Sequence, residues 1–214
     1  MNTQVKSKDR VADFGEVNTS KREVNAMLDL VKQETERLDS RFLEPACGDG
    51  NFLIEVLNRK LDILVKKFKK NQYEFERNSV VVVGSIYGVD ILEDNAKLAR
   101  DRLFNSYLKI YKKYFNKYFN ENLVKSVDFI IEKNIIHGDA LTLKQINLDK
   151  PVTFCEWAII SNKLKRRDFT FSDLLAYAPF EEGTLFSDLG EDVIIPRPIK
   201  EYPLVKYDEA FKLC

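Results

Sequence analysis

The sequence is poor in the residues that build metal sites and disulfide frameworks. Its 214 residues include one histidine, and its three cysteines (Cys47, Cys155 and Cys214) show no Cys-x-x-Cys spacing. This composition argues against a zinc site and against a disulfide-stabilised fold. No apolar run approaches the roughly 20 residues that span a bilayer, and residues 1–16 lack the apolar core of a signal peptide. We therefore expect a cytoplasmic protein with no membrane segment.

The chain also lacks a net charge, because 34 basic and 34 acidic side chains cancel. This balance argues against a wholly basic nucleic-acid binder. The charges are nevertheless unevenly spread, which leaves room for local basic patches. Basic residues cluster at Lys66–Lys70, Lys112–Lys113 and Lys163–Arg167, whereas the stretch Phe180–Asp192 is acidic.

What the chain does contain is a strand, glycine turn and helix pattern at Arg41–Leu53, with the sequence RFLEPACGDGNFL. A short apolar run leads into the tight segment Glu44–Gly50, and a helical pattern begins at Asn51. Gly48 and Gly50 have no Cβ atom, so the backbone can turn sharply and approach a nucleoside closely. The free N–H groups at the start of the helix would point toward the bound molecule.

The rest of the chain alternates between helical and extended patterns. Ser20 or Thr19 would cap a first amphipathic helix, with Glu23 as the capping-box partner of Ser20. The apolar side of this helix would carry Val24, Met27, Leu28 and Val31. We expect strands at 41–46, 85–91, 134–140 and 151–160, helices at 51–70, 96–119 and 123–132, and a loop or short helix at 71–79.

Two acidic residues fall at the ends of predicted strands. Asp90 ends the second strand, where a carboxylate can accept hydrogen bonds from both hydroxyls of a ribose. Its alternative role is to cap the following helix, although Glu93 and Asp94 already supply acidic groups there. Asp139 ends the third strand, where it could accept a hydrogen bond from the exocyclic amine of adenine. His137 lies inside that strand, and we interpret it as structural.

These segments resemble the motifs of class I S-adenosylmethionine-dependent methyltransferases. The Glu-Pro-Ala-Cys opening at residues 44–47 is most similar to the N6-adenine DNA methyltransferases of restriction-modification systems. Residues 88–102 match Gly-Val-Asp-Ile-x-x-x-Asn-x-x-x-Ala-x-x-Arg, residues 138–140 match Gly-Asp-Ala, and residues 15–20 match Gly-(Glu/Arg)-Val-x-Thr-Pro with Ser20 in place of proline. The resemblance implies a Rossmann-like α/β fold with a central, mostly parallel sheet and helices on both faces.

The same resemblance implies S-adenosyl-L-methionine as the cofactor and DNA as a partner. Thr19 would lie near the methionine end of the cofactor, and Ile91 would be the apolar neighbour of its adenine ring. DNA could be reached through a partner subunit of a restriction-modification system. The implied cofactor-binding residues are Thr19, Glu44, Pro45, Ala46, Cys47, Gly48, Gly50, Phe52, Asp90, Ile91, Asp139 and Ala140.

One motif of that family is absent. The fourth strand of N6-adenine methyltransferases ends in Asn/Asp-Pro-Pro-Tyr/Phe, which binds the target amine and stacks on the flipped base. The equivalent stretch here, Pro151–Ile160, contains Cys155-Glu156-Trp157 instead. Glu156 could accept a hydrogen bond and Trp157 could stack, which makes both candidate catalytic residues. The alternative is that Trp157 is simply buried at the end of a strand.

Two basic segments leave further alternatives open. Lys163–Arg167 could contact phosphates or form a solvated hairpin turn. The lysines and aromatic residues of 107–118 could form a surface for single-stranded nucleic acid, but their helical spacing favours a core-facing stripe with a charged back.

The expected organisation is a polar, flexible N-terminus (1–12), a methyltransferase-like domain (13–160) and a C-terminal extension (161–214) that completes the sheet without a target-recognition domain. The expected function is that of a DNA adenine-N6 methyltransferase. Two alternatives are a catalytically incomplete cofactor-binding subunit that works beside a complete methylase, and a methyltransferase that acts on a small molecule or protein.

Overall fold

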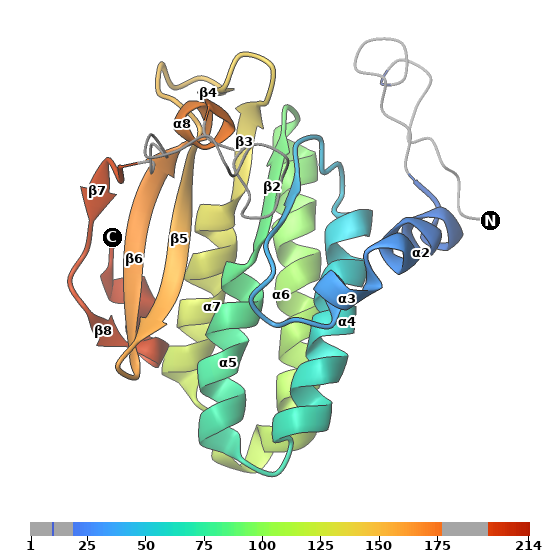
Figure 1. Ribbon diagram of the computed structural model, residues 1–214, viewed down its shortest axis with the longest axis vertical. Helices are drawn as coiled ribbons and strands as arrows, with labels where there is room; N and C mark the ends of the chain where they lie inside the picture. The colour runs from blue at the N-terminus through green and yellow to red at the C-terminus, as the bar shows by residue number, and fades with distance from the viewer. Residues whose placement is uncertain (1–9, 11–18, 177–196) are drawn as a thin grey trace, which may run out of the picture.

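The computed structural model describes residue 10 and residues 19–176 and 197–214, which form a mixed α/β fold (Figure 1). Three expectations therefore lie outside the described residues. These are the N-terminus 1–12 apart from Arg10, residues 15–18 of the motif that precedes the first helix, and the acidic stretch of residues 180–192.

A sheet with three parallel strands lies at the centre of the fold. Strands β1 (Phe42–Glu44), β2 (Ile86–Asp90) and β3 (Ile135–Asp139) are parallel, and β4 (Lys144–Gln145) pairs antiparallel with β3, in the order β1-β2-β3-β4. The predicted strands at 41–46, 85–91 and 134–140 are confirmed within two residues at each end. Because carboxyl ends of parallel strands share one edge, the segments after β1, β2 and β3 meet there.

Helices pack on one face of this sheet. Helices α4 (Asn51–Phe68), α6 (Glu93–Phe115) and α7 (Glu121–Asn134) contribute buried apolar side chains to one large core, together with α5 (Gln72–Gly84). The region 71–79, for which the sequence predicts a loop or a short helix, belongs to a 13-residue helix. Asn71 caps the start of this helix by accepting the Glu74 N–H.

A second, smaller hydrophobic core packs on the opposite face of the sheet. Tyr87 and Val89 of β2 pack in a smaller core with Val152, Phe154 and Phe171. These last residues belong to the segment around β5 (Thr153–Ile160) and to the start of the short helix α8 (Phe171–Ala176). In the described residues, the segment around β5 and one short helix therefore cover this face, where we expected helices.

The C-terminal part of the chain builds a second, antiparallel sheet. Strand β6 (Lys163–Thr170) pairs with β5 along its full length and with β7 (Lys200–Glu201) and β8 (Val205–Lys206). The described part of 161–214 thus extends β5 and does not complete the parallel sheet, which corrects our expectation. The hairpin turn is made by Ser161 and Asn162, both with positive φ, so the basic cluster Lys163–Arg167 is a strand and not a turn.

The first helix shows what sequence spacing predicts well and what it does not. Helix α2 (Lys21–Leu30) has the expected capping box between Ser20 and Glu23. Val24 and Leu28 are fully buried, but Met27 is 52% exposed, because α2 projects from the body and only one side of it packs on α4. It continues into the short helix α3 (Lys32–Thr35).

The long aromatic helix α6 faces the core. Leu103, Tyr107, Tyr111 and Phe115 are buried along one side, which confirms the interpretation as a core-facing stripe. Tyr118, in the short 3₁₀ helix η1 (Asn116–Tyr118) that follows, is 66% exposed.

A membrane-crossing helix and a metal-binding cluster are both absent from the part of the chain that the structure describes. No helix there is long and apolar enough to cross a membrane. Within the same residues, no group of three or more histidine, cysteine or acidic side chains is arranged to hold a metal ion.

A lysine is buried beneath β1. Lys60 of α4 is fully buried, and its Nζ donates to Ser85 Oγ at 2.7 Å, to Leu38 O at 3.3 Å and to Ser40 O. No carboxylate forms an ion pair with it among the described residues. Burial lowers the pKa of Lys60 from its ordinary 10.5 to about 7, because desolvation disfavours the charged ammonium.

This lowered pKa predicts that stability rises with pH above neutrality. Below pH 7 the lysine is protonated in both the folded and the unfolded chain. Between pH 7 and 10.5 only the unfolded chain holds the proton, so the free energy of unfolding should rise by up to about 1.4 kcal/mol per pH unit. Urea unfolding at pH 7, 8 and 9 measures this slope, and Lys60→Met is the control that should lose it. Parallel profiles for the two proteins would contradict the assignment.

Candidate functional site

The loop between β1 and α4, residues 45–50, is shaped by its two glycines. Gly48 and Gly50 have φ values of 52° and 85°, which favour glycine over any residue with a side chain. A Cβ on Gly50 would lie 3.1 Å from the Cβ of Ala99 on α6. Gly50 starts α4 without a side-chain cap, so backbone N–H groups in the first turn remain available to a ligand.

Asp90 ties this loop to the end of β2. Its Oδ2 accepts the Gly48 N–H at 2.7 Å. Its Oδ1 accepts the Leu92 N–H at 2.9 Å and the Asn95 side-chain amide at 3.3 Å. The residue is 7% exposed. Asp90 therefore stabilises the turn before α6, whose N-cap is Leu92 without a side-chain cap, and also holds the glycine loop in place.

The backbone of the loop is also anchored at Cys47. Its N–H donates to Val89 O and its carbonyl accepts from the Gly50 N–H, both at 2.9 Å. The Cys47 side chain is buried, and burial raises the pKa of its thiol well above the ordinary value. A Cβ on Gly88 would lie 3.0 Å from the Cys47 sulfur and 2.8 Å from Leu53. Cys47 is thus a packing residue that sets the distance between the loop and β2.

Arg102 is a loop-holding residue to which we assigned no role from the sequence. From α6, its Nη1 donates to Asp49 O at 2.6 Å and lies 3.0 Å from the Asp49 carboxylate, while Nη2 donates to Asn51 Oδ1 at 2.9 Å. The signal in the sequence is the Ala-x-x-Arg spacing in residues 99–102. About one helical turn separates Ala99, which faces Gly50, from Arg102, which donates hydrogen bonds to Asp49 and Asn51.

Glu44 is a half-buried carboxyl at the end of β1, directly before the loop. Desolvation by burial raises the pKa of Glu44 above its ordinary value, although a backbone hydrogen bond from Ala46 acts in the opposite direction. Among the described residues it forms no ion pair. Pro45 follows in the turn, and Phe52 on α4 is partly buried against the core. Glu44 is therefore a partly exposed carboxylate beside the glycine loop that forms no ion pair among the described residues.

The third strand end carries Asp139. Its Oδ1 accepts the Leu141 N–H at 2.8 Å and its Oδ2 accepts the Thr142 hydroxyl at 2.9 Å. The Leu141 backbone bond is the main cause that lowers the pKa of Asp139, so this carboxylate is ionised at neutral pH. Ala140 follows and is partly exposed.

Ile91 directly follows Asp90 at the end of β2, and its carbonyl faces the third strand, β3. His137 Nε2 is 3.1 Å from the Ile91 carbonyl, which fixes the segment after β2 against β3. Ile91 is 44% exposed although it directly follows the buried strand β2. It is therefore available to pack against a flat apolar ligand.

Thr19 is exposed at the start of α2. This end of α2 lies beside the first turns of α4, because Lys21 Nζ is 3.0 Å from Glu55 Oε1 and Asn25 Nδ2 is 3.5 Å from Glu55 Oε2. Since α4 begins at the glycine loop, Thr19 comes to the same end of the molecule as that loop.

The two candidate catalytic residues are both engaged within the protein. Trp157 is 8% exposed, its Nε1 donates to Asn134 Oδ1 at 2.9 Å, and its ring meets Phe129 edge-on. Glu156 pairs with Arg41 at 2.5 Å and with Arg167 at 2.6 Å. These contacts favour the structural alternative for Trp157, and they leave Glu156 neutralised by two arginines.

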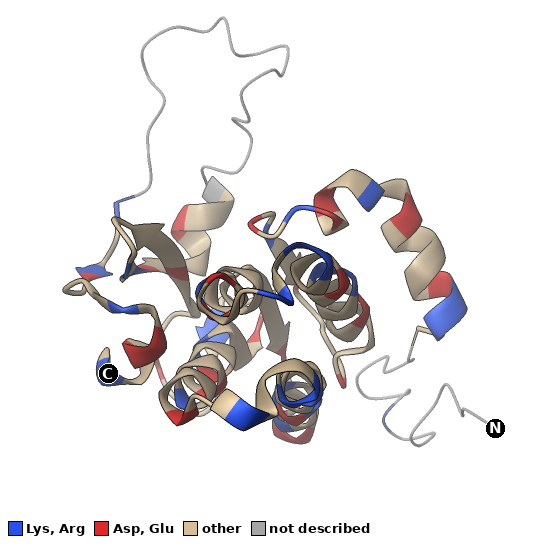
Figure 2. Cartoon of the chain, turned by 90° about the horizontal axis from the view of Figure 1, so that it is seen from below, with Lys and Arg blue, Asp and Glu red and all other residues tan. Residues whose placement is uncertain are grey.

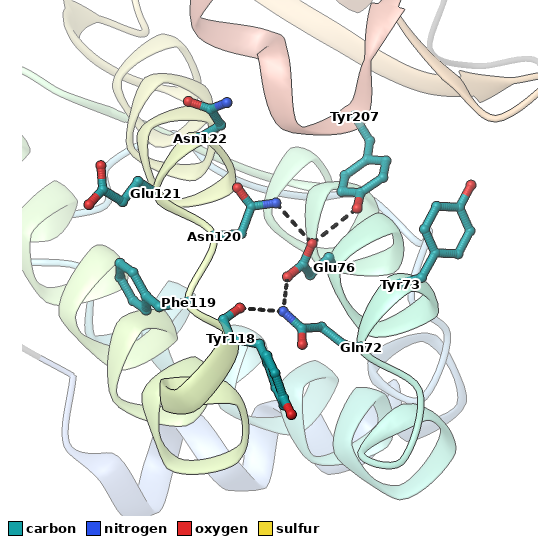
Figure 3. Close-up of a pocket in the computed structure, with 9 residues that line it drawn as sticks. All are labelled: Gln72, Tyr73, Glu76, Tyr118, Phe119, Asn120, Glu121, Asn122 and Tyr207. Carbon is teal, nitrogen blue, oxygen red and sulfur yellow. Dashed lines mark hydrogen bonds between the residues drawn. The ribbon is translucent and has the colours of Figure 1, made fainter.

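A cleft of about 660 Å³ lies elsewhere, between α5, the start of α7 and the 3₁₀ helix η2 (Tyr207–Lys212) (Figure 3). At its base the buried Glu76 accepts hydrogen bonds from Gln72, Tyr111, Asn120 and Tyr207. Its acceptor sites are filled by the protein itself, and the network ties the C-terminal segment to α5. The cleft contains none of the predicted site residues, so we interpret it as structural.

The comparison with protein families agrees with the geometry at the strand ends. Residues 16–153 match the family described as MmeI, DNA-methyltransferase domain. This match spans the glycine loop and the ends of β2 and β3. No curated protein and no solved structure matches the chain. Because the family match covers well over half of the chain, the protein belongs to the MmeI DNA-methyltransferase domain family of restriction-modification methyltransferases.

Proposed function

We propose that the chain binds S-adenosyl-L-methionine in a Rossmann-like methyltransferase fold and serves the N6-methylation of adenine in DNA. One observation carries the proposal. The glycine loop, Asp90 and Asp139 follow three adjacent parallel strands at one edge of the sheet, and Asp90 binds the loop directly. Ligands of open α/β sheets bind at this edge.

The residues present suit the parts of this cofactor. The loop has no Cβ at Gly48, which lets the adenosine approach the backbone, and the missing Cβ of Gly50 lets the loop pack against Ala99 of α6. Ile91 offers an exposed apolar side chain for the adenine ring, and Asp139 is an ionised acceptor for its exocyclic amine. Glu44 has a carboxylate without a cationic partner among the described residues, which suits the ammonium of the methionine moiety.

The hydrogen bonds of Asp90 limit its role toward the ribose. A carboxylate offers about four acceptor positions, and three protein donors already use three of them. Asp90 therefore accepts one ribose hydroxyl in this proposal, and not the two that the sequence suggested.

The alternative of a cofactor-binding module also has an observation in its favour. The sequence contains no Asn-Pro-Pro-Tyr motif, and Glu156 and Trp157 are engaged in contacts within the protein. The amine-binding groups would then come from another polypeptide segment or subunit. Attack of the adenine amine on the methyl group needs positioning and a dipolar pocket more than acid–base catalysis. Transfer of the label from labelled cofactor to mixed-sequence DNA, measured with and without a complete methylase, distinguishes the enzyme from the module. Transfer by the chain alone supports the enzyme, and no transfer by the chain alone supports the module.

Calorimetric titration with S-adenosyl-L-methionine tests the site itself. We expect binding by the wild type and roughly 10- to 100-fold weaker binding by Glu44→Gln at pH 8, because a hydrogen bond to a charged group contributes about 1.5–3 kcal/mol. The wild-type affinity should fall as the pH is lowered from 8, because Glu44, whose pKa is raised by burial, takes up a proton.

The glutamine variant is the matched control for this pH effect, since it keeps the shape of Glu44 but cannot titrate. Asp139 has a lowered pKa, so it takes up a proton only at a lower pH than Glu44 does. Absence of binding by the wild type would refute the cofactor site. Equal affinities and equal pH profiles for wild type and Glu44→Gln would remove Glu44 from it.

A further inference from the structure

The structure gathers seven lysines at the end of the molecule that lies opposite the glycine loop. Helices α4 and α6 each follow a parallel strand directly, so both begin at the carboxyl edge of the sheet and run back to its other end. They also pack against each other. Their final turns and the residues just beyond carry a group that we term the lysine end: Lys66, Lys67, Lys69, Lys70, Lys112, Lys113 and Lys117. Figure 2 looks toward this end from below.

These lysines are exposed, and none of them forms an ion pair within the described parts of the chain. Asp62, one helical turn before Lys66, and Glu121 at the start of α7 are exposed carboxylates nearby, and neither pairs with them. The lysines that do pair with carboxylates lie elsewhere: Lys21, Lys32, Lys133, Lys144, Lys165 and Lys212. The positive charge of the lysine end is therefore not neutralised locally.

Exposed aromatic rings accompany part of this group. Lys113 Nζ lies over Tyr114 at 5.5 Å and Lys117 Nζ lies over Tyr118 at 5.4 Å, measured to the ring centroids. Tyr114 is 37% and Tyr118 is 66% exposed. The rings hold the ammonium groups near the surface without neutralising them.

The other basic cluster of the sequence does not offer the same surface. In β6, Lys165 pairs with Glu201, Arg166 with Asp168 and Arg167 with Glu156. Three of the four basic residues in Lys163–Arg167 are thus paired, whereas none of the seven lysines of the lysine end is paired within the described residues. Since the whole chain has no net charge, this end gives the molecule a marked charge asymmetry.

We propose that the lysine end binds the phosphate backbone of DNA without reading its sequence. This inference rests on the proposed function, because it assigns the DNA contact of the same enzyme or module. Helix α4 starts at the glycine loop and has 18 residues, so the lysine end lies about 27 Å from that loop, the length of roughly eight base pairs. It therefore does not touch the target adenine. The lysine end binds a part of the DNA that is distant from the methylated base. This contact raises the local concentration of DNA near the enzyme.

The test compares two quadruple variants with equal charge changes. The first carries Lys66→Gln, Lys67→Gln, Lys112→Gln and Lys113→Gln. The control carries Lys32→Gln, Lys133→Gln, Lys144→Gln and Lys212→Gln, all at ion-paired lysines on other surfaces. Binding of mixed-sequence duplex DNA is measured by fluorescence anisotropy at several salt concentrations. Circular dichroism and cofactor calorimetry are measured on the same proteins.

We expect the first variant to bind duplex DNA roughly tenfold or more weakly at low salt, with a salt slope reduced by about 0.9 for each phosphate that the variant no longer neutralises. The control should stay close to the wild type, and cofactor binding should be unchanged in both. Equal DNA affinities and equal slopes for the two variants would overturn the inference. Failure of the wild type to bind cofactor would refute the proposed function while leaving the DNA result interpretable by itself.

Discussion

Replacing Asp90 by alanine should weaken cofactor binding by about 100-fold or more, because a hydrogen bond to a charged group contributes about 1.5–3 kcal/mol and the substitution removes more than one such bond. The carboxylate accepts from Gly48, Leu92 and Asn95 within the protein and would accept one ribose hydroxyl. Its removal leaves the Gly48 N–H without its partner and frees the glycine loop from β2. Calorimetry with S-adenosyl-L-methionine measures the change in affinity.

The contributions of loop and ribose can be separated with two simpler ligands. Adenosine carries the ribose and adenine does not. If Asp90 binds the ribose, Asp90→Ala should lose more affinity for adenosine than for adenine. If it only holds the loop, both affinities should fall by the same factor. Asp90→Asn is the matched variant, since it keeps the size but has only one carbonyl acceptor. Unchanged cofactor affinity in Asp90→Ala would contradict both roles.

The largest loss of stability is expected from breaking a buried ion pair in the second sheet. Arg166 and Asp168 of β6 form two parallel hydrogen bonds at 2.8 and 2.9 Å, with side chains that are 6% and 9% exposed. Arg166 also donates to the Leu213 carbonyl and stacks on Tyr202 at 4.2 Å. Arg166→Met leaves the Asp168 charge buried and unpaired, which should lower the free energy of unfolding by about 3–5 kcal/mol. Urea unfolding measures this quantity.

The double variant Arg166→Met/Asp168→Leu is the control for this prediction. It removes both charges and keeps an apolar filling, so it should regain most of the stability that the single variant loses. An equal loss in the single and the double variant would mean that packing of Arg166 against Phe129, Trp157 and Tyr202, and not the unpaired charge, dominates.

Much of the edge of the sheet around the glycine loop could be predicted from local sequence because its determinants are local. Two glycines close together allow the positive φ values of the loop, a serine three residues before a glutamate forms the capping box, and helical spacing buries one side of α6. The strand ends at Asp90 and Asp139 meet because consecutive parallel strands must align their carboxyl ends. Arg102 shows the limit, since its contacts with Asp49 and Asn51 cross about 50 positions of the chain.

The sequence by itself therefore determined the glycine loop, the strand-end acids and the identity of most helices and strands, because each depends on neighbouring residues. The tertiary structure alone decided which polar and aromatic groups remain available. Glu156 meets Arg41 across 115 positions of sequence and Trp157 meets Asn134 across 23, while Lys165 and Arg167 of β6 pair with Glu201 of β7 and Glu156 of β5. Whether a charge is paired, or a ring buried, depends on partners that chain folding brings from far away, and local spacing carries no information about them.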